Sequence, residues 1–104
     1  MKIWLDDLRP APDGWIHAHS VNEFKAFIKT QGIPEEVSLD HDLGDFSHDG
    51  GDGWKATLWL CEKEIWPERV VVHSANAVGR SRMLADMEYY GPYHKTGWNV
   101  LTRD

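Results

Sequence analysis

Ionisable and hydroxyl side chains stand directly after three short apolar runs of the chain. They are Asp6, Asp7, Asp40, His73 and Ser74. Clustered carboxylates repel one another unless a cation joins them, and carboxylate oxygens are ligands that Mg²⁺ prefers. If the fold brings the ends of these runs together, the pattern favours a functional cluster that binds a metal ion over a solvated acidic face.

Two histidines belong to this pattern, because His41 follows Asp40 and His73 precedes Ser74. A histidine gives or takes a proton near neutral pH, and opening a phosphodiester requires a proton for the leaving oxygen. Taken alone, each is explained as well by a structural role as by catalysis: His41 as a turn residue, and His73 as a partly buried imidazole at a strand end. Together they favour acid–base catalysis beside a metal. The histidines without such neighbours, which we expect to be structural or exposed, are His17, His19, His48 and His94.

The elements that must position these side chains follow from the apolar pattern and its breakers. We expect strands over residues 2–5, 15–19, 36–39, 70–72 and 98–101, and helices after Ser20 and over residues 54–65 and 78–90. Glu23 completes a capping box with Ser20, and Gly32 and Pro34 end that helix. Alternating strands and helices imply a parallel sheet, whose strands all end at the edge where ligands bind. We therefore expect the acidic and histidine side chains to meet there.

Length and composition narrow the class of protein. The chain has 104 residues, the length of one domain, so we expect a single α/β domain over residues 1–104. Its net charge of −6 argues against general DNA binding, which needs a basic surface. Cys61 is the only cysteine, which excludes an intrachain disulfide and a cysteine-based zinc site and favours a reducing compartment. We find no signal peptide or membrane span and expect a cytoplasmic protein.

Three blocks of the sequence carry a resemblance to a known family. They are residues 5–10 (LDDLRP), 38–44 (SLDHDLG) and 73–80 (HSANAVGR). Over nearly its whole length the chain resembles the receiver domains of two-component signalling, and more closely the divergent cyclic-phosphate processing receiver family. The resemblance implies a three-layer, receiver-like (flavodoxin-like) α/β fold with a parallel sheet of four to five strands.

The resemblance also implies roles for individual residues. Asp6 and Asp7 would hold a divalent cation, and Asp40 matches the phosphoacceptor aspartate. Asp42 matches the position whose main-chain carbonyl binds the metal, and Ser74 matches the hydroxyl residue that contacts the phosphoryl group. Such oxygen ligands suit Mg²⁺ and would also accept Mn²⁺.

Two departures from ordinary receivers argue against phosphotransfer signalling. The lysine that ordinary receivers carry after the fifth strand is not evident, since Lys95 precedes the last expected strand and only Arg103 lies beyond it. A proline-rich loop over residues 7–15 also stands where ordinary receivers have their first helix.

We therefore expect a metal-dependent phosphoesterase that acts on a cyclic phosphate or a related phosphodiester, either in a small molecule such as a cyclic nucleotide or at an RNA end. His41 and His73 would share the proton transfer. The residues expected to hold phosphate oxygens are Ser74, Asn76, Arg80 and Arg9. Two alternatives stay open: a receiver phosphorylated at Asp40, and a non-catalytic receiver-shaped module that binds a protein partner.

Overall fold

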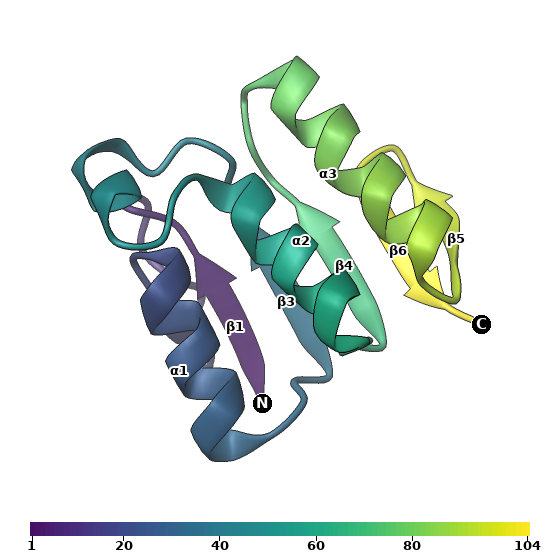
Figure 1. Cartoon of the computed structure of the whole chain (residues 1–104), viewed down its shortest axis with the longest axis horizontal. Coiled ribbons are helices and arrows are strands. Elements are labelled where there is room, and N and C mark those ends of the chain that lie inside the picture. Colours follow the sequence, from purple (N-terminus) through teal and green to yellow (C-terminus); the bar gives the residue numbers. More distant parts are fainter.

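A six-stranded sheet and three helices make up the fold (Figure 1), and the computed structural model describes residues 1–104. The strands are β1 (Lys2–Leu5), β2 (Ile16–Ala18), β3 (Glu36–Leu39), β4 (Arg69–Val72), β5 (Tyr93–Gly97) and β6 (Val100–Arg103). The helices are α1 (Val21–Gln31), α2 (Gly53–Lys63) and α3 (Ala77–Tyr90), with a 3₁₀ helix η1 (Gly44–His48) inside the segment expected to be a loop. None of these helices is long and apolar enough to cross a membrane.

The strand order is β2-β1-β3-β4-β6-β5, and the first four strands are parallel. The prediction of a receiver-like α/β fold is confirmed, and the sheet is mostly rather than wholly parallel. The sheet has more strands than expected, because the C-terminal segment forms an antiparallel hairpin, β5 and β6, that extends it beyond β4. The strand expected over residues 98–101 is therefore β6, which lies inside the sheet, while β5 forms the edge.

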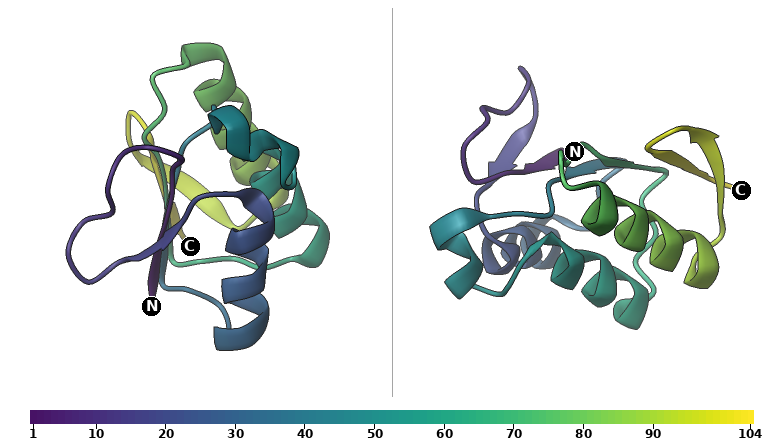
Figure 2. Two further views of the ribbon diagram at one scale, coloured as in Figure 1. Left: turned by 90° about the vertical axis from the view of Figure 1, so that its left-hand side faces the viewer. Right: turned by 90° about the horizontal axis from the view of Figure 1, so that it is seen from above.

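The helices cover the sheet on one face only, as Figure 2 shows in the view from above. Right-handed crossovers that advance in one direction place their helices on one face, and β2, β3 and β4 follow one another in that direction. The step from β1 back to β2 runs over the other face, and its connection is a loop without a helix. The expected three layers are therefore two. Side chains that face the uncovered side, such as Trp4 and Val71, are only partly buried, whereas Ile3 and Val70 are fully buried.

Helix α1 begins as its sequence predicts. The Ser20 hydroxyl accepts a hydrogen bond from the Glu23 N–H at 3.1 Å, and the Glu23 carboxylate accepts one from the His19 N–H at 3.2 Å. The capping box is therefore closed one residue before the usual position. Gly32 ends the helix at a φ of +91°, a conformation that favours glycine.

Candidate active site

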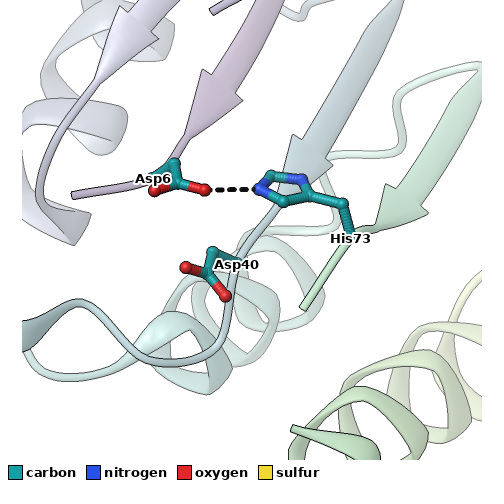
Figure 3. Close-up of side chains that lie close together, drawn as sticks. All are labelled: Asp6, Asp40 and His73. Atoms are coloured by element: carbon teal, nitrogen blue, oxygen red, sulfur yellow. Dashed lines mark hydrogen bonds and ion pairs between the residues drawn. The ribbon is translucent and has the colours of Figure 1, made fainter. Parts of the chain in front are cut away.

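The carboxyl ends of β1, β3 and β4 bring three predicted site residues together (Figure 3). Leu5, Leu39 and Val72 lie in register across these strands, so the residue after each of them lies at the same level above the sheet. These next residues are Asp6, Asp40 and His73, and one ligand atom from each lies within 4.8 Å of the others. The parallel topology thus produces the cluster that the sequence predicts.

Asp6 is the most heavily hydrogen-bonded of the three. Its Oδ1 accepts bonds from the backbone N–H groups of Leu8 and Arg9, at 2.9 and 2.8 Å. Its Oδ2 accepts bonds from Arg9 Nε and His73 Nε2, both at 2.9 Å. Burial raises the pKa of Asp6, but the two backbone donors, His73 and the charge of Arg9 together outweigh it and lower the pKa. The ionised carboxylate is therefore an anchor for its neighbours.

Both ring nitrogens of His73 are engaged. Nε2 donates to Asp6, and Nδ1 accepts a bond from the Ser38 hydroxyl at 2.8 Å. Trp4 stacks on the imidazole with the ring centroids 3.9 Å apart and the planes within 5° of parallel. Burial lowers the pKa of His73, and the hydrogen bond and charge of Asp6, which raise it, do not compensate. A neutral ring with its proton on Nε2 fits these partners.

Arg9 places its guanidinium between two carboxylates. It lies 2.9 Å from Asp6 Oδ2 and 3.5 Å from Asp40 Oδ2, and it also donates to the His73 carbonyl at 3.4 Å. The Trp4 indole N–H donates to the Arg9 carbonyl at 2.9 Å and fixes the loop that carries the arginine. Because half of the Arg9 side chain is exposed, its remaining donors are free for an anion.

An open cavity of about 340 Å³ lies in front of these side chains. Its walls are Asp6, Asp7, Asp40 and Asp42 together with Leu8, Arg9, Gly44, Ser74 and Ala75. Gly44, at a φ of +54°, leaves room for one of these carboxylates, because a Cβ there would come within 2.6 Å of Asp7 Oδ2. The sequence therefore brings four carboxyl groups, one hydroxyl and one guanidinium around one space.

The donors around this cavity fit a hard divalent cation. Asp7 makes no hydrogen bond within the chain, and one oxygen of Asp40 has only the 3.5 Å contact with Arg9, so both carboxylates have lone pairs free for a metal. Asp6 accepts four hydrogen bonds and lies behind Asp7 and Asp40. Asp42 lines the same space. The set is rich in oxygen, as Mg²⁺ and Mn²⁺ require.

His41 stands in the chain between Asp40 and Asp42, which line the cavity, but is not itself one of its walls; it lies between the starts of two helices. Its Nδ1 lies 2.8 Å from Asp42 Oδ1, and its Nε2 lies 3.7 Å from a carboxylate oxygen of Asp52, the residue that caps α2. The ring packs on Gly79 in the first turn of α3, where an added Cβ would approach it to 2.5 Å. The hydrogen bond from His41 is the main reason that the pKa of Asp42 is lowered. Asp42 thus fixes the orientation of the imidazole.

The four predicted phosphate-binding residues divide into two pairs. Ser74 and Arg9 line the cavity, and the Ser74 hydroxyl accepts a bond from the Asn76 N–H at 3.1 Å. Asn76 instead caps α3, because its side-chain oxygen accepts from the Gly79 N–H at 2.9 Å. Arg80 turns away from the cavity and donates to the Ser74 carbonyl at 2.8 Å.

Sequence reasoning does not identify Trp4, Ser38 or His17 as part of this site. Ser38 is a polar residue inside an apolar strand, which is a signal for a buried hydrogen bond. His17, expected to be structural, lies with Nε2 2.8 Å from the Asp6 carbonyl and supports the loop from behind.

The family model described as cyclic-phosphate processing receiver domain matches residues 1–89, which include every site residue described above. No curated protein and no solved structure matches the chain significantly.

Proposed function

The chain belongs to the cyclic-phosphate processing receiver family, and on this premise we propose that it is a metal-dependent phosphoesterase that opens a cyclic phosphate or a related phosphodiester. The observation that carries the proposal is the cavity in which Asp7, Asp40, Arg9 and Ser74 face one space. Carboxylates suit a cation there, and the guanidinium and hydroxyl suit the phosphate that the cation would attract.

The proposed ligands are Asp7 and Asp40, with the Asp42 main-chain carbonyl beside them and Asp6 behind them. A divalent cation held here would neutralise the phosphate charge and activate water. Arg9 would donate to the phosphate oxygens, because Asp6 holds its Nε and leaves its outer face exposed. The Ser74 hydroxyl would donate to another phosphate oxygen.

His41 is the proposed proton-transfer residue. Its Nδ1 is fixed by Asp42, and its Nε2 lies 3.7 Å from Asp52, too far for a hydrogen bond, so Nε2 is free to exchange a proton. His73 has no such freedom, because Asp6 and Ser38 engage both of its nitrogens. We therefore narrow the expectation that both histidines transfer protons and propose that His73 positions Asp6.

The rival function, phosphorylation of Asp40, receives less support from the same cavity. No lysine lines it. Intact-mass spectrometry after incubation with acetyl phosphate separates the two functions. We expect no stable adduct, and a long-lived aspartyl phosphate that is lost in Asp40→Asn would favour the signalling function instead.

The proposed activity is tested directly with 2′,3′-cyclic nucleoside monophosphates and linear phosphoesters in the presence of Mg²⁺ or Mn²⁺. Phosphorus NMR should show ring opening by the wild-type protein and none by Asp7→Asn. Asp45→Asn is the matched control, because Asp45 is an exposed acid of η1 outside the cavity. Absence of turnover on every ester with both metals would remove the proposal and leave the non-catalytic binding module.

A further inference from the structure

A second, smaller cavity of about 190 Å³ lies between α3 and the β5–β6 hairpin. Its walls include Arg80, Ser81, Glu88, Lys95 and Trp98. Trp98 is the least expected of these, since 68% of its surface is exposed at the tip of the hairpin. The Arg80 guanidinium lies over its ring, and Lys95 lines the same cavity.

The hairpin tip is fixed at the same edge of the sheet as the candidate active site. Asn99, next to Trp98, accepts a hydrogen bond from the Val72 N–H at 3.1 Å, and its side-chain amide donates to the Val72 carbonyl at 3.0 Å. Val72 is the last residue of β4 and directly precedes His73. The tip therefore lies beside the strand end that carries Ser74 into the first cavity, and Figure 1 shows the hairpin alongside α3.

Arg80 connects the two cavities. Its Nη1 donates to the Ser74 carbonyl at 2.8 Å, and its Cζ lies 4.8 Å from the centroid of the Trp98 ring. One side chain thus spans from a wall of the first cavity to the aromatic face of the second. Because the stack covers the indole with a planar cation and leaves Trp98 largely exposed, a further flat group has access to the ring.

We propose that this second cavity is a nucleoside subsite, which takes the base of the nucleotide that precedes the one carrying the terminal cyclic phosphate, so that the substrate is the end of an RNA strand rather than a mononucleotide. Trp98 provides a stacking surface for the base, and Arg80 and Lys95 provide positive charge for the intervening phosphodiester. Glu88 and Ser81 provide an acceptor and a hydroxyl for base edges. The proposal rests on the proposed function, because the first cavity must take the phosphate, and only ribose carries the 2′ oxygen of such a ring.

A binding experiment tests the subsite without requiring turnover. The probe is a fluorescein-labelled six-nucleotide RNA that ends in a 3′-phosphate, and its fluorescence anisotropy reports the Kd. We expect Trp98→Ala to weaken binding by about 5- to 150-fold, the range of one base–aromatic stack, and Trp98→Phe to retain most of the affinity. Tyr89→Ala is the matched control, since Tyr89 is an exposed aromatic residue of α3 outside the cavity, and it should bind as the wild type does.

A second variant makes the test independent of the tryptophan. Lys95→Gln should reduce the slope of log affinity against log salt by about 0.7, the value for one phosphate contact on a single strand. An RNA with an abasic residue next to its 3′ end should bind the wild type as weakly as intact RNA binds Trp98→Ala.

The outcomes separate this proposal from the proposed function. RNA binding that depends on Trp98, in a protein that opens no cyclic phosphate, would support the subsite and remove the phosphoesterase. Equal affinity of wild type and Trp98→Ala for the RNA, or equal affinity for intact and abasic RNA, would overturn the subsite even where cyclic mononucleotides are hydrolysed. A Trp98-dependent protein complex without any RNA binding would overturn it as well.

Discussion

Trp4 and His73 stack face to face with their centroids 3.9 Å apart, although one belongs to β1, the other follows β4, and β3 lies between these strands. Ser38 of β3 pairs in register with Trp4 and gives its hydroxyl to His73 Nδ1. The His73 imidazole therefore lies over the small Ser38 and against the large Trp4, on the face of the sheet without helices. Three strands thus fix the ring that donates to Asp6.

Replacement of Ser38 by alanine tests this arrangement. The change leaves the partly buried Nδ1 of His73 without a donor, and we expect it to reduce the free energy of unfolding by about 1–3 kcal/mol. Urea denaturation measures the loss. Ser47→Ala is the control, because its hydroxyl bonds to the Gly44 carbonyl at an exposed site and its removal should cost less. Equal stability of wild type and Ser38→Ala would mean that the hydrogen bond does not hold the ring.

Metal binding should appear in thermal stability. A cation that binds the native state at 100 times its Kd stabilises that state by about 2.7 kcal/mol, so Mg²⁺ or Mn²⁺ should raise the Tm. Asp7→Asn should abolish the rise, and Gly44→Ala should reduce it, because the added Cβ would meet Asp7 Oδ2 at 2.6 Å. Asp45→Asn should behave as the wild type does.

Titration calorimetry provides the independent measurement of metal binding. Failure of millimolar Mg²⁺ and Mn²⁺ to bind the wild-type protein would contradict the metal site and with it the proposed hydrolysis.

The parallel part of the fold can be predicted from the sequence, because each of its main strands is a short apolar run that ends in polar residues. Strand β5 cannot, since only Tyr93 among its residues is buried and no alternation marks it. Its position depends on pairing with β6, a contact between segments that the pattern of either one does not reveal. The one-sided helix layer likewise depends on strand order.

The candidate site is likewise only partly predictable from the sequence. The meeting of Asp6, Asp40 and His73 follows from parallel strands that end in register, and the sequence predicts it. The partners of each side chain do not follow, because they depend on which strands are neighbours and where loops fold back. Arg9 is predicted to hold phosphate, but it also forms ion pairs with Asp6 and Asp40. Arg80 lies against Trp98 of the β5–β6 hairpin, and the apolar pattern of the sequence does not predict that hairpin.

The pH dependence of stability should report on His73. Burial lowers its pKa in the folded protein below the ordinary value of about 6.5, so the unfolded chain takes up its proton first as the pH falls. The contribution of the neutral ring is therefore complete above about pH 6.5 and is lost as the pH falls through the folded pKa. Urea midpoints measured in EDTA between pH 7.5 and 5 should decrease.

The variant His73→Gln should flatten this decrease, whereas a variant of the exposed His94 should retain it. A midpoint that rises on acidification, or one that falls equally in His73→Gln, would show that another group controls stability in this range.

Proton transfer provides the sharpest distinction between the two histidines. If His41 protonates the leaving oxygen, His41→Ala should lose about 10²- to 10⁴-fold in turnover of a 2′,3′-cyclic nucleotide and keep its metal affinity. A nitrophenyl phosphodiester needs little protonation of its leaving group, so this substrate should recover much of the loss. His73→Ala should lose activity equally on both substrates, because removal of its ring releases Asp6 and the Arg9 guanidinium that Asp6 holds.

For each variant, the ratio of its turnover on the nitrophenyl ester to its turnover on the cyclic nucleotide therefore shows whether the missing histidine is the proton donor. The size of either loss alone is not needed. A rescue by the nitrophenyl ester in His73→Ala and not in His41→Ala would reverse the assignment, and it would require His73 to break its bond with Asp6 or Ser38 during catalysis. Metal affinity measured on both variants tests whether the activity is lost because the metal is lost. His41→Ala should keep the metal, since it leaves the carboxylates of Asp7 and Asp40 in place. Undiminished turnover in both variants would mean that water supplies the proton and that both histidines have only structural roles.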